Sequence, residues 1–183
     1  MSNQKELKGN TLRCFTDGAA KKNAKEASAG WAFYIPILDI RRSGHIVGTN
    51  NQAELMAIKE LLTYIKNELD LSTLKFDSQP DILVFSDSNY AINVLTGCKY
   101  AQNIDLINSI FELGVDLKKY YNRIKFKHVE AHTNNTDWLS NCNDIVDKLA
   151  SEAANPKKDK DKNEKKDKKL SKKKTTKKIF EKK

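Results

Sequence analysis

The sequence of 183 residues lacks several features that mark specialised classes of protein. It has no run of eighteen apolar residues, so we expect no membrane-spanning helix. The first ten residues are polar and do not contain the apolar stretch of a secretory signal. Its three cysteines, Cys14, Cys98 and Cys142, are far apart and form no CxxC pair. We therefore expect neither a disulfide framework nor a zinc knuckle, and a reducing compartment inside the cell, cytoplasm or nucleus, fits best.

The excess positive charge is confined to one end of the chain. Of the 33 lysines and arginines, 15 lie in residues 155–183, together with 5 of the 24 acidic residues. This segment has a net charge of +10, whereas the rest of the chain has a net charge of −1. A lysine-rich segment with so few apolar residues cannot bury enough surface to fold alone. The charge pattern predicts a flexible lead at 1–10, one folded domain at 11–154 and a disordered tail at 155–183.

The apolar pattern of residues 11–154 is typical of an α/β domain. Strand-like runs occur at 12–16, 30–36, 43–47, 81–86 and 123–129. Helical spacing occurs at 51–67, 88–95, 103–120 and 139–154, and we expect a loop at 71–80. The fourth strand is almost wholly apolar, which predicts a central strand covered on both faces. The order βββαβααβα implies a mixed five-stranded sheet, with three antiparallel strands and further parallel ones, flanked by helices.

Four acidic residues occur where these elements could bring them together. Asp17 follows the first strand and precedes Gly18, Asp87 follows the fourth strand, Glu54 lies in the first turn of a helix, and Asp147 lies in the last helix. Taken singly, the Asp17-Gly18 pair also fits a hairpin turn, and Glu54 or Asp147 fits a helix cap or a solvated rim. Four neighbouring carboxylates repel one another, and hard divalent cations such as Mg²⁺ remove that conflict.

Four segments of the chain resemble the type 1 ribonuclease H family, in the order of that family and with roughly its spacing. They are Phe15–Gly18, Thr49–Leu55, Phe85–Tyr90 and Asn143–Ala150, with shorter matches at Asn103–Leu106 and Ala131-His132. The resemblance covers about residues 11–154 and implies a ribonuclease H-like fold. It also implies that Asp17, Glu54, Asp87 and Asp147 are the catalytic metal ligands. His132 would place or deprotonate water, or aid product release.

The activity that this resemblance implies is cleavage of the RNA strand of RNA–DNA hybrids, which leaves 5′-phosphate and 3′-hydroxyl ends. Two Mg²⁺ ions, with Mn²⁺ as a substitute, would activate the attacking water and stabilise the leaving oxygen. By the same resemblance, Asn23, Asn50 and Asn89 line the substrate and Thr49 could hold a phosphate of the DNA strand. Each of these four also fits turn or cap chemistry. His45 and His128 match no motif, so we expect structural or exposed side chains.

Two departures from the family pattern bear on substrate binding. Residues 21–26 lack the glycines and prolines usual in the turn after the first strand, and residues 96–102 replace a basic, Trp-rich protrusion that many bacterial members carry. We expect the lysine-rich tail to bind nucleic acid in place of the protrusion, although a nuclear-localisation signal or a solubilising tail fits its composition too.

Other functions stay open at this point. One is a catalytically silent hybrid-binding module, which the presence of all four acids disfavours. Another is a nuclease of the same fold, such as a transposase or integrase core, which the Thr49–Leu55 segment disfavours. We expect a monomer whose partner is nucleic acid, and no membrane.

Overall fold

The computed structural model of the protein describes residues 5–7, 11–21, 27–76, 78–97, 102–130 and 137–155. The strands in these ranges are β1 (Lys5–Leu7), β2 (Thr11–Ala20), β3 (Ser28–Ile35), β4 (Ile40–Val47), β5 (Leu74–Phe76), β6 (Asp81–Ser86) and β7 (Arg123–His128). The helices are α1 (Asn50–Asp70), α2 (Asn89–Leu95), α3 (Ile104–Leu117) and α4 (Trp138–Ala153), and a 3₁₀ turn at Pro36–Leu38 joins β3 to β4.

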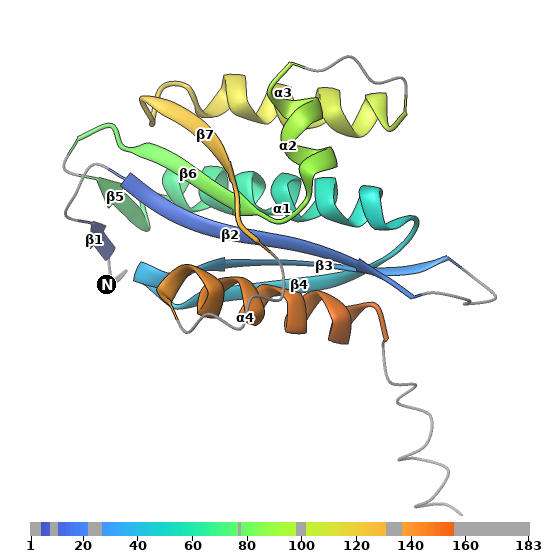
Figure 1. Ribbon diagram of the computed structural model, residues 1–183. Coiled ribbons are helices and arrows are strands. Elements are labelled where there is room, and N and C mark those ends of the chain that lie inside the picture. Colours follow the sequence, from blue (N-terminus) through green and yellow to red (C-terminus); the bar gives the residue numbers. More distant parts are fainter. Residues whose placement is uncertain are drawn as a thin grey trace, which may run out of the picture.

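Five of these strands form one mixed sheet in the order β4-β3-β2-β6-β7 (Figure 1). The pairs β2–β3 and β3–β4 are antiparallel, as expected for hairpin-connected strands. The pairs β2–β6 and β6–β7 are parallel, and the chain reaches β6 through α1 and β7 through α2 and α3. The predicted five-stranded sheet with antiparallel and parallel parts is therefore confirmed.

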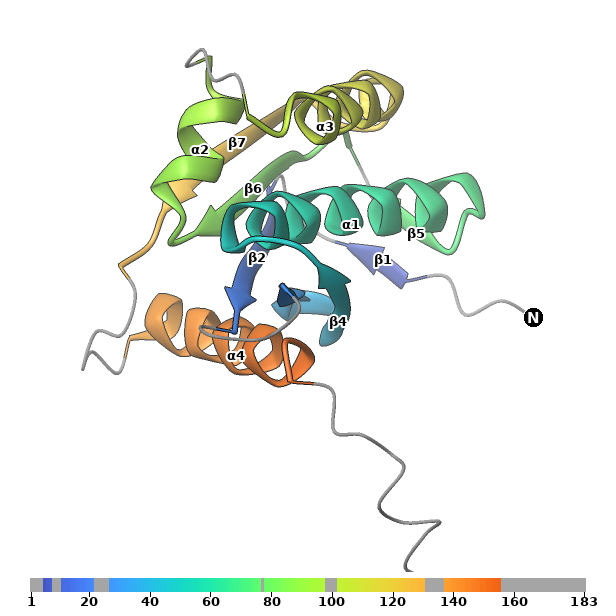
Figure 2. The ribbon, with the colours of Figure 1, turned by 90° about the vertical axis from the view of Figure 1, so that its right-hand side faces the viewer.

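Helices lie on both faces of the sheet (Figure 1, Figure 2). On one face α1 packs on β2 and β3 and contacts α3, while α2 contacts β6 and β7. On the other face α4 packs on β2, β3 and β4. On that second face α4 buries Phe85 of β6, but among the described residues no helix packs substantially on β7 (Figure 2).

The alternation of side chains along β2 divides the core into two apolar clusters. Leu12 and Cys14 point towards α1 and are buried there with Phe33, Leu55 and Ile58. The smaller cluster lies under α4, where the stacked rings of Phe15 and Phe85 have centroids 4.9 Å apart. Burial of each large side chain contributes about 1.5–3 kcal/mol, so both clusters hold β2 rigidly between them.

Several local expectations are confirmed by the structure. The Thr49 hydroxyl accepts a hydrogen bond from the Gln52 amide, and the Gln52 side chain accepts one from the Thr49 amide, which completes a capping box. The Ser88 hydroxyl caps α2 by accepting a hydrogen bond from the Ala91 amide, and Gly97 follows that helix with a φ of 116°. Cys14 is buried in the apolar core with a free thiol.

Three expectations about the strands need correction. β2 does not end at Thr16 but continues to Ala20, so Asp17 lies within a strand, opposite Ala32, and not in a hairpin turn. Its last residues are small rather than β-branched, which hides the strand in the sequence. The predicted loop at 71–80 contains β5, which pairs in parallel with β1, and three residues are too few to show a period. β6 is covered on both faces only in part, because Leu83 stays half-buried.

Some predicted features fall outside the described residues. They are Asn23, Cys98, His132, residues 156–183 and most of the predicted lead. The expectations for these positions stay predictions. None of the helices in the described part of the chain combines the length and the hydrophobicity that crossing a membrane demands.

Candidate active site

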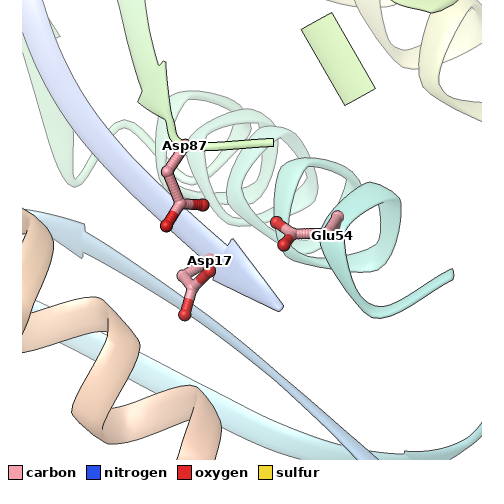
Figure 3. A group of neighbouring side chains, drawn as sticks. All are labelled: Asp17, Glu54 and Asp87. Carbon is pink, nitrogen blue, oxygen red and sulfur yellow. The ribbon is translucent and has the colours of Figure 1, made fainter. Parts of the chain in front are cut away.

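Three carboxylates from three different elements converge at the end of the sheet where β2 meets α1 (Figure 3). Asp17 lies in β2, Glu54 lies in α1, and Asp87 is the residue that directly follows β6. One oxygen atom of each lies within 4.8 Å of the other two. Asp17 and Glu54 are each only 4% exposed, and Asp87 is half-buried. The sequence therefore predicted these three neighbours correctly, although they are 33 or more residues apart.

The parallel pairing of β2 with β6 places the two aspartates side by side. Phe15 lies directly opposite Phe85 in this pair. Asp17 and Asp87 each come two residues later, so both side chains leave the backbone on the same face and at the same level. The stacked phenylalanine rings beneath them fix the register that brings the two carboxylates together.

Gly18 allows α1 to approach β2 closely enough to bring in Glu54. A Cβ atom at residue 18 would overlap the backbone nitrogen of Glu54 and the carbonyl carbon of Ala53. The capping box at Thr49 fixes where α1 begins, and Glu54 follows in its second turn. Glu54 lies beside the apolar stripe of α1 but is nevertheless buried, because it faces the end of the sheet.

The two oxygens of Glu54 differ in their surroundings. Oε1 accepts a hydrogen bond of 3.4 Å from Nδ2 of Asn50. Oε2 is buried and has no hydrogen-bond partner. A buried carboxylate oxygen without a partner is costly unless a cation or a proton satisfies it.

Asp147 lies close to this group without belonging to its tight core. It is half-buried on α4, and its negative charge is one of the causes that raise the pKa of Asp17. Gly30 lets α4 approach β3 closely, since a Cβ atom there would overlap the backbone of Ala150 and Ala154. A close fit of this helix on the sheet therefore determines how near Asp147 comes to Asp17.

The electrostatics of the cluster favour a bound cation. Burial, and then the charges of Asp87 and Asp147, raise the pKa of Asp17 to about 8. Burial, and then the charges of Asp17 and Asp87, raise the pKa of Glu54 well above its ordinary value. Without a cation, the cluster must keep protons at neutral pH. Its all-oxygen donor set and the unpartnered Oε2 of Glu54 fit a hard divalent cation.

The other described residues predicted to bind substrate lie close in sequence to the acidic residues of the cluster. Asn50 and Asn89 are exposed, and they lie one residue after the cap of α1 and two residues after Asp87, respectively. The Thr49 hydroxyl accepts the capping hydrogen bond, so its structural role is established. His45 lies 3.0 Å from the Ser28 hydroxyl and His128 is exposed, as expected for histidines outside the site.

Sequence patterns gave no sign of the two glycine contacts or of the burial of Asn143. Asn143 lies one helical turn before Asp147, is 2% exposed, and has an Oδ1 atom without a partner. Asn143 belongs to one of the family motifs, but its burial was not predicted. A glycine at a contact between two backbones has no signature in a single sequence.

The sequence profile of the RNase H family matches residues 9–155, which is most of the chain and all of the five-stranded sheet. The chain belongs to the RNase H family. It is a ribonuclease H-type hydrolase, an endoribonuclease with an acidic cluster of the kind described above.

Individual relatives and solved structures agree with this assignment. The chain is 29% identical over 158 residues to a ribonuclease H of Tropheryma whipplei, covering 81% of this chain and 88% of that protein. It is 32% identical over 124 residues to a probable ribonuclease H of Acanthamoeba polyphaga mimivirus, covering 58% and 48% of the two chains.

Two solved structures share the ribonuclease H fold with this chain. An RNase H1 from the archaeon Halobacterium salinarum has a TM-score of 0.51 at 24% identity, covering 78% of this chain and 96% of that one. The N-terminal RNase H domain of a Mycobacterium tuberculosis protein has a TM-score of 0.55 at 18% identity, covering 80% and 94%. At these identities the likeness concerns the fold.

Proposed function

We propose that this RNase H cleaves the RNA strand of RNA–DNA hybrids and leaves 5′-phosphate and 3′-hydroxyl ends. The observation that carries the proposal is the convergence of Asp17, Glu54 and Asp87 in a chain of this family. Two of the three carboxylates are buried, and one oxygen has no partner. Burying neighbouring carboxylates in this way costs the folded protein stability. The cost is explained if the carboxylates hold cations that act on a phosphodiester.

Asp17, Glu54, Asp87 and Asp147 would hold two divalent ions, with Mg²⁺ preferred and Mn²⁺ as a substitute. When bound, such ions would supply charge stabilisation at the phosphate and a more acidic water. Asp17 is the natural shared ligand, because the charges of both Asp87 and Asp147 act on it and its own charge acts on Glu54. Because Asp87 is partly exposed, the substrate could reach the cluster from its side.

Neighbouring side chains would select and position the substrate. Asn50 and Asn89 are exposed, and their amides can both donate to and accept from the 2′-hydroxyl that distinguishes RNA from DNA. Asn23 would act similarly, and Thr49 would contact a phosphate of the DNA strand. His132 would move a proton at the attacking water or aid departure of the product.

The proposal extends to how the chain is organised. Residues 11–154 would form the catalytic domain, and the lysine-rich tail at 155–183 would contact the nucleic acid from outside it. A monomer would suffice, because all the acidic ligands come from one chain. A reducing compartment such as the cytoplasm or nucleus would suit a chain whose described cysteines are unpaired.

The experiment is to incubate the full chain with a labelled hybrid, a duplex RNA and a duplex DNA, each with Mg²⁺ and with a chelator. We expect cleavage of the hybrid alone, in the RNA strand and with Mg²⁺ only. A DNA polymerase should then extend the products, because their 3′ ends are free hydroxyls.

Other outcomes would overturn the proposal. Binding of the hybrid without cleavage would identify a catalytically silent module. Comparable cleavage of duplex DNA would identify a nuclease of the same fold with another substrate.

A further inference from the structure

The sheet has an open area on the face that carries Asp17. On this face α4 packs on β2, β3 and β4 and buries Phe85 of β6, but in the described part of the chain it leaves the rest of β6 and β7 largely uncovered (Figure 2). Leu83 in the middle of this area is only half-buried, although it lies in an interior strand of the sheet. Leu83 packs at the margin of the apolar cluster under α4, so the intramolecular cover of this face ends beside it.

Four exposed cations surround Leu83 on this surface, which we call the basic face. They are Arg13 of β2 and Arg123, Lys125 and Lys127 of β7. The register places Arg13, Leu83 and Lys125 in one row across three strands. Lys127 lies in the next row, opposite Phe85, and Arg123 in the previous one, opposite Asp81. The alternation of side chains along a strand puts all of them on the face of Asp17.

The basic face keeps a clear excess of positive charge. Its one acid on β6, Asp81, lies 3.2 Å from Arg123 and 2.7 Å from Lys125. The hydrogen bond from Lys125 is the largest cause that lowers the pKa of Asp81 to about 2, so this carboxylate is ionised near neutrality. Arg13 and Lys127 form no ion pair with any residue in the described ranges. Two of the four cations are therefore left for a partner of opposite charge.

We propose that the basic face binds the phosphate backbone of the hybrid where it extends beyond the catalytic carboxylates. This inference rests on the proposed function. The basic face continues directly from the acidic cluster on the same strands, since Arg13 precedes Asp17 by four residues of β2, or about 13 Å. Lys127 is level with Phe85, only two residues before Asp87. Arg123 lies six residues, or about 20 Å, back from the level of Asp87, a length of roughly six base pairs at 3.4 Å each.

The charge distribution explains why such a surface is useful. The acidic cluster repels a polyanion, and residues 1–154 carry a net charge of only −1. Cations placed beside the carboxylates would offset this repulsion where the duplex leaves the site, and phosphate contacts position a duplex without reading its sequence. A second copy of this chain offers less complementarity, because it would present the same cations.

The test compares the double variant Arg13→Gln/Lys127→Gln with Lys75→Gln/Lys118→Gln, both in the full chain. The control pair removes the same charge from exposed lysines on β5 and at the end of α3, which also lack ion pairs among the described residues. For each protein one would measure kcat and KM on a 30-base-pair hybrid, and Kd without metal, across a salt series. Thermal unfolding would verify that both variants fold.

We expect the basic-face variant to raise KM and Kd roughly tenfold at about 0.1 M salt, with kcat unchanged. The salt dependence of log Kd should become shallower by about two units, because each lost phosphate contact removes ~0.9. The control variant should change these values by less than about twofold. Equal effects of the two variants, or no effect of either, would refute the inference, as would a change confined to the oligomeric state. A wild type that binds the hybrid without cutting it would refute the proposed function, and the Kd comparison would still decide the role of the basic face.

Discussion

At the scale of one residue, Asp17 shows how the active site lowers the stability of the folded protein. Its folded pKa of about 8 lies above the ordinary value of 3.8, because of burial and then the charges of Asp87 and Asp147. A group with a raised acid pKa prefers to be protonated in the folded state. In the absence of metal, its ionisation therefore destabilises the protein as the pH rises from about 4 to about 8.

The variant Asp17→Asn should be more stable than the wild type at pH 7.5 in the presence of a chelator. The reason is that the wild-type carboxylate, which is ionised in the unfolded chain at pH 7.5, must take up a proton on folding, whereas the amide is neutral in both states. A gain on the order of 1 kcal/mol would raise Tm by roughly 2–4 °C. The difference should vanish at pH 4, where the wild-type side chain is protonated. Asp144→Asn, on the exposed side of α4, is the matched control. A lower Tm of Asp17→Asn at pH 7.5 would contradict this account of the cluster.

His132 should contribute to the rate without being indispensable. We expect His132→Ala to lower kcat by roughly 10²- to 10⁴-fold, the usual worth of a general acid or base. The carboxylates would still hold their cations, so a residual Mg²⁺-dependent activity should survive. Single-turnover and steady-state rates measured together would separate slow chemistry from slow product release. If both rates equal those of the wild type, His132 has no part in the reaction.

At the scale of elements, the sequence predicted the fold well wherever a period was long enough to see. The helical stripe of α1 and the apolar run of β6 indicated where the hairpin strands end and the helix-connected strands begin. The family motifs then placed Asp17, Glu54 and Asp87 together, as the structure confirms. What the sequence could not show were contacts between backbones, which depend on the distance between elements far apart in the chain.

The basic face could be predicted from the sequence only in part. Arg123, Lys125 and Lys127 alternate along β7, and this period of two predicts that they share one face. Whether that face is open depends on where α4 packs, which no local pattern reveals. The partly buried Leu83 shows why an apolar run alone overestimates how completely a strand is covered.

Gly18→Ala should disturb the meeting of β2 and α1. The added Cβ would overlap the backbone of Ala53 and Glu54, so one element must move. Overpacking of this kind costs about 1–3 kcal/mol, and the displacement of Glu54 should lower kcat beyond what the loss of stability explains. The measurement is chemical denaturation together with kcat at a temperature where all variants are folded.

Gly114→Ala in α3 is the matched control for this substitution. Its Cβ would have only the Tyr121 hydroxyl nearby, at 3.9 Å, so no overlap results. Alanine should stabilise this helix by roughly 0.5–1 kcal/mol and leave kcat unchanged. If Gly18→Ala behaves like Gly114→Ala, the close approach of β2 to α1 does not position Glu54.

At the scale of the whole molecule, we expect the basic face and the lysine-rich tail to offset the repulsion between the acidic site and a polyanion. Truncation after Ala154 removes a net charge of +10 but none of the four carboxylates. We expect a raised KM, a shallower salt dependence and a nearly unchanged kcat. A chain of full length with the tail lysines replaced by glutamine should behave like the truncation. An unchanged KM at low and moderate salt would show that the tail does not serve the substrate.

We propose that the carboxylate cluster cleaves RNA through the cations it holds. The most direct measurement is single-turnover cleavage of a labelled hybrid by wild type, Asp17→Asn and Asp144→Asn across a Mg²⁺ titration. We predict that the wild type and Asp144→Asn respond alike to Mg²⁺, and that Asp17→Asn stays inactive at every concentration while remaining folded. Retention of most of the Mg²⁺-dependent activity by Asp17→Asn would contradict the claim.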